Sequence, residues 1–144
     1  MNYRKIYSLA IAEILKGNPL RMCLGDGERD TVMLNNYCIC FLPKDKNIFA
    51  LKTREFPDKF ERILPKGELV EVCRTDTLLD TKPKARLMKT ADDKEYPYLI
   101  DNTFLGCFNQ DAEIKVNPRA KASPFYIYEN GELAGIIAPI RQKK

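Results

Sequence analysis

The segment from Pro124 to Arg141 constrains the fold more than any other part of the sequence. Two β-prone runs, residues 125–128 and 133–137, flank the dipeptide Asn130-Gly131. Asn-Gly tolerates the positive φ angles of a type I′ turn, so the segment is predicted to form an antiparallel hairpin. The second run is apolar at nearly every position, which predicts that both faces of its strand are covered. Pro139 lacks a backbone N–H and is expected to end the pairing, leaving the hairpin as the closing edge of the fold.

The remaining sequence predicts two helices and several strands. Residues 3–16 show helical spacing of apolar side chains, and the predicted buried face is Tyr7, Ala10, Ile11, Ile14 and Leu15. A second helix is predicted from about Pro97 to about Asn109, with an inner stripe of Ile100, Phe104, Cys107 and Phe108. Strands are expected at residues 22–24, 31–42, 48–53, 69–73, 85–88 and 113–117, and prolines limit residues 56–65 to two helical turns at most. This order predicts one α+β domain, residues 1–144, with a largely antiparallel sheet.

The sequence contains no histidine. This excludes Ser-His-Asp and Cys-His nucleophile pairs, as well as zinc sites that combine Cys with His. The acidic residues Asp92, Asp93 and Glu95 lie in a charge-dense stretch, where a solvated loop is favoured over a metal site or an acid–base pair. We therefore expect no catalytic residue, no metal site and no cofactor, and interpret the chain as a protein that is not an enzyme.

The five cysteines favour a reduced, cytoplasmic protein, because their number is odd and no export signal is recognisable. Cys38 and Cys40 lie within an apolar run and lack the C-x(2 to 4)-C spacing of zinc knuckles, so buried structural cysteines are expected. The apolar run near the N-terminus is interrupted by Glu13 and Lys16. No stretch approaches the roughly 18 apolar residues of a membrane span, so no membrane partner is expected.

The net charge of +4 indicates a mildly basic surface. Basic residues gather loosely in three places: Arg4, Lys5 and Lys16; Lys82, Lys84, Arg86 and Lys89; and Arg141, Lys143 and Lys144. These groups are compatible with nonspecific phosphate contacts, but an ordinary solvated surface is the favoured interpretation. Tyr126 and Tyr128 alternate along one predicted strand, where they could stack on bases or pack on the sheet.

Three segments in the last third of the sequence share the pattern of a known family. They are Tyr96-Pro97-Tyr98-Leu99-Ile100-Asp101 with Phe104-Leu105, Ala112-Glu113-Ile114-Lys115-Val116, and Gly135-Ile136-Ile137-Ala138-Pro139-Ile140-Arg141. In this order they resemble the second helix, the next strand and the C-terminal ending of a domain of the bacterial sliding clamp, the β subunit of the replicative DNA polymerase. Residues 55–65 resemble the clamp segment Phe-Pro-Asp-Tyr-x-x-Val-x-Pro, which leads from one domain toward the next.

The resemblance implies a DNA-clamp-like α+β fold in which two helices pack on one face of a largely antiparallel curved sheet. It implies binding to double-stranded DNA without sequence preference, or to replication proteins, with Arg4, Lys5 and Lys16 as the DNA-binding residues. Clamps carry three such domains per chain and form a ring of six, so a single domain would have to form a homo-oligomer to encircle DNA.

In clamps the C-terminal segment also helps to form a groove for partner peptides. Pro139, Ile140 and Arg141 are the positions of this sequence that carry over, and they are the expected partner-binding residues. The alternative function is a small regulatory or protein-interaction module, of the kind carried by mobile elements, that binds a protein partner and not DNA.

Overall fold

The computed structural model of the chain describes residues 1–18, 21–24, 28–49 and 64–142. It is an α+β protein with a large antiparallel sheet, as the sequence predicts. The described elements, in chain order, are α1 (Tyr3–Leu15), β1 (Arg21–Leu24), β2 (Arg29–Leu34), β3 (Cys38–Pro43), the 3-10 turn η1 (Lys44–Lys46), β4 (Val70–Leu79), β5 (Ala85–Thr90), β6 (Tyr98–Asp101), α3 (Asn102–Leu105), β7 (Glu113–Val116), β8 (Phe125–Glu129), β9 (Glu132–Ile137) and β10 (Ile140–Arg141).

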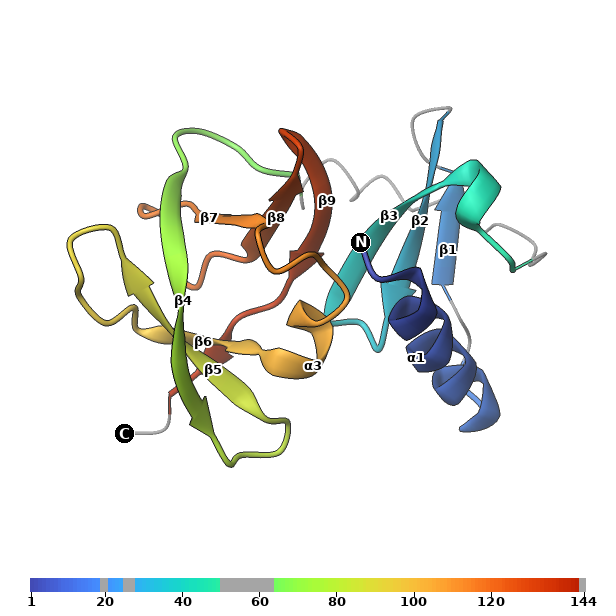
Figure 1. The fold of residues 1–144 in the computed structure, drawn as a ribbon, viewed down its shortest axis with the longest axis horizontal. Coiled ribbons are helices and arrows are strands. Elements are labelled where there is room, and N and C mark those ends of the chain that lie inside the picture. Colours follow the sequence, from blue (N-terminus) through green and yellow to red (C-terminus); the bar gives the residue numbers. More distant parts are fainter. Residues whose placement is uncertain (19–20, 25–27, 50–63, 143–144) are drawn as a thin grey trace.

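The strands follow the order β1-β2-β3-β9-β8-β7-β4-β5-β6-β10, and each neighbouring pair is antiparallel. Strand β10, at one end of this order, pairs with β6. Along the chain, β10 follows β9 after only Ala138 and Pro139, and β9 pairs with β8. The strands β4 to β8, together with β9 and β10, therefore close into a barrel. In Figure 1 the barrel lies on the left, and β3, β2 and β1 continue the sheet from β9 to the right, where α1 packs beside β2.

The C-terminal hairpin confirms its predicted turn and corrects its predicted place. Asn130 and Gly131 have φ angles of 52° and 78°, the two positive values of a type I′ turn. Pairing of β9 ends at Ile137, before Pro139, also as predicted. However, β9 lies between β3 and β8 and is not at an edge of the sheet. A strand that is apolar on both faces can equally well have a partner along each side, which explains this error.

The extent of the second helix is predicted wrongly. Tyr98–Asp101 is strand β6, which pairs with β5 and β10, and only Asn102–Leu105 is helical. The Oδ1 atom of Asp101 accepts hydrogen bonds from the backbone N–H groups of Thr103 (2.8 Å) and Phe104 (3.4 Å). Asp101 is therefore the N-cap, and the helix begins after it. An apolar run that fits a helical stripe also fits a short strand. Here the pairing with β5 and β10 favours the strand.

The first helix forms as predicted, but its buried face differs. Ile6 and Ala10 are fully buried, whereas Ile11 and Leu15 are 44% and 81% exposed. Apolar residues cover most of the circumference of α1, so helical spacing fits two stripes that share Ala10. The stripe on the side of β2 contains Ile6, and Ile11 and Leu15 of the predicted stripe lie outside it. One apolar face of α1 thus remains at the surface.

The long strand expected at residues 31–42 is two strands, β2 and β3, joined at Asn35 and Asn36 with φ angles of 49° and 59°. Asparagine tolerates this left-handed conformation, so an Asn-Asn turn breaks a run that is apolar on both sides. The strands expected at residues 22–24, 69–73, 85–88 and 113–117 are confirmed within β1, β4, β5 and β7. Residues 50–53 and most of the proline-bracketed segment 56–65 lie outside the described residues.

One continuous hydrophobic core joins the barrel to the α1 layer. It includes Ile6 and Ala10 of α1, Val32, Cys40 and Leu42 of β2 and β3, and Val72, Met88, Ile100, Phe125, Ile127 and Ile137 of the barrel. A smaller cluster of Ile39, Phe41, Tyr126 and Ile136 lies on the other face of β3, β8 and β9. Strand β9 contributes to both clusters, which explains why it is apolar at nearly every position.

Candidate functional site

The predicted DNA-binding residues lie on two flanks of α1. Lys5 and Lys16 are eleven residues apart, about three turns or about 16 Å along the axis, and so lie on the same flank. Lys16 is exposed and pairs with Glu13 at 3.5 Å, whereas Lys5 is half-buried with its side chain against Gly106. Arg4 is exposed on the neighbouring flank. The structure therefore brings Lys5 and Lys16 to one side of the helix and leaves Arg4 apart.

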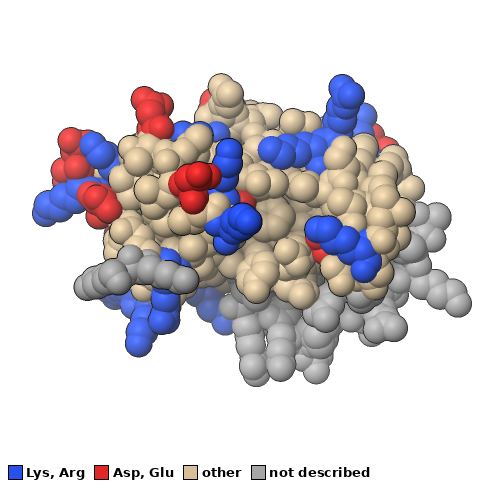
Figure 2. All heavy atoms as spheres, turned by 90° about the horizontal axis from the view of Figure 1, so that it is seen from below, with Lys and Arg blue, Asp and Glu red and all other residues tan. Residues whose placement is uncertain are grey.

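The face seen from below carries lysine and arginine side chains in separate groups, with uncharged surface between them (Figure 2). Acidic side chains gather mainly toward one end of this view. Such a pattern offers isolated contact points for phosphates and no continuous basic stripe.

The predicted partner-binding residues help to close the barrel. Ile140 is opposite Leu99 and Arg141 is opposite Tyr98 in the pairing of β10 with β6. Pro139 and Ile140 are half-buried, and the side chain of Arg141 is exposed. The backbone of this segment is therefore already paired within the chain, which leaves the Arg141 side chain as its most accessible part.

A pair of arginines, Arg74 of β4 and Arg86 of β5, forms the most unusual charged group in the described part of the chain. Arg74 is opposite Met88 in the β4–β5 pairing, and Arg86 is two residues from Met88. Residues two apart on a strand share a face, so both arginines project from the face that also carries the buried residues Val72 and Met88. Both arginine side chains are half-buried as a result.

Neutral oxygen atoms hold the two guanidinium groups. Arg74 donates to the carbonyl oxygen of Asn109 (2.8 Å), and Arg86 donates to the Oδ1 atom of Asn102 (3.0 Å) and to the carbonyl oxygen of Thr75 (2.5 Å). These bonds tie β4 and β5 to α3 and to the segment that follows it. Among the described residues, neither arginine has a carboxylate within ion-pair distance.

Burial lowers the pKa of Arg74, and the nearby positive charge of Arg86 lowers it further. The carboxylates of Asp111 and Glu129 act more weakly in the opposite direction. Glu129 is itself engaged by the N-terminal amine of Met1 at 2.9 Å. The two arginines therefore form a like-charge pair that the described residues neutralise only in part.

Sequence reasoning included Arg86 in a loose basic group but missed Arg74. The pattern that could have found it is strand alternation, because Arg74 follows Val72 at the spacing of one strand face. A charged residue at an inward-facing position of a strand is partly buried, whereas a charged residue within a run of charges is usually solvated.

Three of the cysteines lie in the hydrophobic core. Cys38, Cys40 and Cys107 are fully buried, with 3.9 Å between the Sγ atoms of Cys38 and Cys40, and burial raises the pKa of the Cys38 thiol. Cys73 is exposed, contrary to the expectation of buried cysteines, and the side chain of Cys23 lies outside the described part. No group of His, Cys, Asp and Glu in the described residues has the arrangement of a metal centre.

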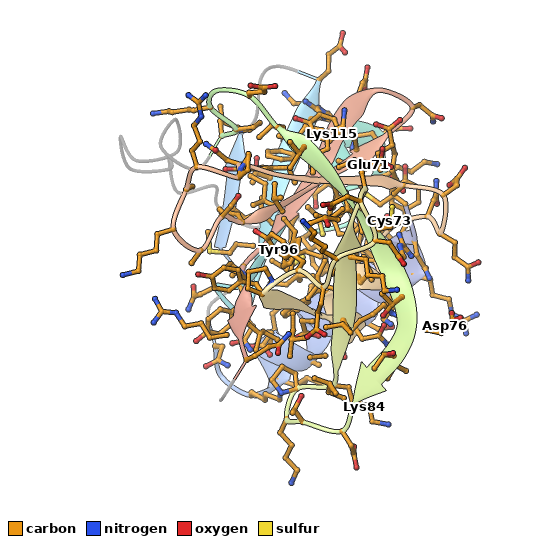
Figure 3. The ribbon with its side chains drawn as sticks, turned by 90° about the vertical axis from the view of Figure 1, so that its left-hand side faces the viewer. Glu71, Cys73, Asp76, Lys84, Tyr96 and Lys115 are labelled. Atoms are coloured by element: carbon orange, nitrogen blue, oxygen red, sulfur yellow. The ribbon has the colours of Figure 1, made fainter. Side chains whose placement is uncertain are left out.

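The outer face of the β4–β7 pair carries charges of both signs. Figure 3 shows Glu71, Cys73 and Asp76 in sequence along this strand. Glu71 is opposite Lys115 of β7, whose ammonium lies 4.9 Å from the centre of the Tyr128 ring. This face resembles an ordinary solvated sheet surface, and Tyr128 is covered by a lysine instead of presenting an open ring.

The acidic loop is also solvated, as predicted. Asp92 and Asp93 are exposed and pair with Lys94 (3.1 Å) and Lys89 (2.9 Å). Such exposed ion pairs contribute little stability.

In the described ranges, no helix is both long and apolar enough to span a membrane. Comparisons of the chain with protein-family models, with curated proteins and with solved structures found no match.

Proposed function

We propose that this chain is a non-catalytic protein that binds double-stranded DNA through its phosphates, as a clamp-like unit of the replication machinery. The DNA contacts we expect are Arg4 and Lys5 of α1 and Lys16, the residue that caps the C-terminal end of α1. The observation that carries the proposal is the placement of Lys5 and Lys16 on one flank of a surface helix, about 16 Å apart. Two cations on one flank of a helix can contact different phosphates of one duplex without reading its bases.

The chain's surface supports a weak, nonspecific interaction. The net charge is +4, and Glu13 partly neutralises Lys16 through the 3.5 Å ion pair. Phosphate contacts of this kind release counterions, so the affinity must fall with salt. The link to replication depends on the resemblance of residues 96–105, 112–116 and 135–141 to the sliding clamp.

The test is binding of a fluorescent duplex by wild type and by the double variant Lys5→Gln/Lys16→Gln over a range of salt concentrations. The variant should bind more weakly, and the slope of log K against log salt should become shallower by about two units, one for each lost phosphate contact. The matched control is Lys66→Gln/Lys121→Gln, which removes the same charge from two exposed positions outside α1. Equal losses in the two variants, or binding that does not depend on salt, would exclude the α1 contact.

Encircling DNA as a ring would require more than surface binding. One domain of 144 residues cannot surround a duplex, so encirclement requires a closed oligomer of several copies. Mass measurement in solution decides this point, because a monomer or simple dimer would exclude a ring while leaving surface binding intact.

A second candidate function is a protein-interaction module. The observation that favours it is the apolar stripe that α1 leaves at the surface: Ile11 is 44%, Ile14 41% and Leu15 81% exposed. Neighbouring exposed apolar residues on one helix are a common feature of protein-binding surfaces. If the chain failed to bind DNA at low salt, this stripe would become the favoured functional surface.

A further inference from the structure

We propose that Arg74 and Arg86 form a binding site for a phosphate group, separate from the basic residues of α1. Both arginines lie on the same face of the β4–β5 pair, where α3 and Asn109 meet the barrel. The site would take a phosphate oxyanion, either of a nucleic acid or of a small phosphorylated molecule.

The first argument is electrostatic. Two half-buried guanidinium groups that repel one another are unfavourable without a counter-charge, and the described residues supply none within ion-pair distance. A purely structural role explains the bonds to Asn102, Thr75 and Asn109. A structural role alone does not explain why two neighbouring cations, and not uncharged donors, bind these neutral oxygens. An anion bound between them would remove the repulsion.

The second argument is the number of donors that remain. A guanidinium group has five N–H donors in a planar fork. The described residues give Arg74 one acceptor and Arg86 two, all of them oxygen atoms without charge. Both groups therefore keep free donors, and partly exposed side chains can present them to a ligand.

The third argument is the match between the donors and the ligand. Arginine forks bind phosphate through paired, charge-assisted hydrogen bonds, which are shorter and stronger than bonds between neutral groups. Two forks can engage different oxygens of one tetrahedral phosphate. The bonds to Thr75, Asn102 and Asn109 restrict both side chains before any ligand arrives, which lowers the entropy cost of binding.

The test uses pyrophosphate as the probe and the full chain, by calorimetric titration and by thermal unfolding at constant ionic strength. Wild type should bind pyrophosphate and unfold at a higher temperature with it than with chloride. Arg74→Gln and Arg86→Gln should each weaken binding about tenfold or more, because each removes charge-assisted hydrogen bonds. Arg119→Gln is the matched control, since Arg119 is exposed and its only hydrogen bond among the described residues is from its backbone N–H to Asn117.

Two further measurements keep the test decisive if a glutamine variant fails to fold. Arg74→Lys and Arg86→Lys keep the charge but lose the fork, and they should bind more weakly than wild type. In wild type alone, pyrophosphate must stabilise the fold more than chloride does at equal ionic strength. The absence of this difference, or equal binding by wild type and all Arg74 and Arg86 variants, would overturn the proposal.

The source of the phosphate is decided with oligonucleotides that carry or lack a 5′-phosphate. Binding that depends on Arg74 for both oligonucleotides indicates an internal phosphodiester, whereas dependence only with the 5′-phosphate indicates a terminal phosphate. Arg74-dependent binding of pyrophosphate with no effect on either oligonucleotide indicates a small phosphorylated ligand. Lys5→Gln/Lys16→Gln should still bind pyrophosphate, so failure of the α1 proposal leaves this site intact, and the reverse also holds.

Discussion

Gly135 of β9 is the position where adding one methyl group should be most damaging. A Cβ atom there would lie 2.6 Å from the carbonyl oxygen of Ile39 and closer still to the ring of Phe108. Carbon atoms pack favourably at about 3.5 to 4.0 Å, so both contacts are strongly repulsive. Phe108 is 4% exposed and lies within the core cluster, and the oxygen belongs to the backbone of β3, which pairs with β9.

Overpacking of a core typically costs about 1 to 3 kcal/mol. For Gly135→Ala we expect a loss of about 3 kcal/mol or more, because a ring and a backbone group would both have to move. Urea unfolding followed by circular dichroism measures this loss. Gly131→Ala is the control: nothing lies within 4 Å of its added Cβ, so only the strain of its φ of 78° remains, about 1 kcal/mol.

The double variant Gly135→Ala/Phe108→Ala tests the mechanism. Phe108→Ala alone should cost about 3 to 5 kcal/mol through the cavity it leaves. In the double variant the new methyl group enters that cavity, so the combined cost should be smaller than the sum by at least about 1 kcal/mol. If Gly135→Ala changed stability by less than about 0.5 kcal/mol, the close packing of Phe108 on β9 would be refuted. Strict additivity in the double variant would refute it as well.

Two further predictions concern buried ionisable groups. Burial raises the pKa of Asp101, so the folded chain binds more protons than the unfolded chain between the two pKa values, and stability falls as pH rises through the folded pKa. The variant Asp101→Asn keeps the Oδ1 acceptor for α3. In urea titrations, its free energy of unfolding relative to wild type should therefore increase from acid to neutral pH. If this difference in free energy stayed constant or decreased, the effect of burial on Asp101 would be contradicted. Native alkylation with iodoacetamide should label Cys73 at once and the three buried cysteines only after denaturation, as read by peptide mass mapping; rapid native labelling of a buried thiol would contradict the packing. The buried set is Cys38, Cys40 and Cys107.

Local patterns in the sequence were sufficient where neighbouring residues decide the structure. Asn130-Gly131 determines its own turn, and the helical spacing of residues 3–16 is sufficient to predict α1. The α+β class follows from the order of such elements. The exposed acidic loop around Asp92 was also predictable, because burying a run of charged side chains is too costly.

Long-range pairing decided the features that were missed. Tyr98–Asp101 became a strand because β5 and β10 provide partners on both sides, and neither contact is visible in local spacing. The buried stripe of α1 depends on which face meets β2. Strand alternation could have revealed the inward position of Arg74, but not its proximity to Arg86, because the two residues approach each other only after β4 and β5 pair.

The position of β9 has a kinetic consequence. This strand joins β3 through the opposed residues Cys38 and Ile137, which come from distant parts of the chain, so a large loop must close before the contact is gained. Folding dominated by such distant pairings is slow, on the order of milliseconds to seconds. During that interval the free side of β3 is an unpaired edge on which other molecules can form intermolecular sheets. Refolding yield should therefore fall as protein concentration rises, even though the finished fold has β3 enclosed between two strands.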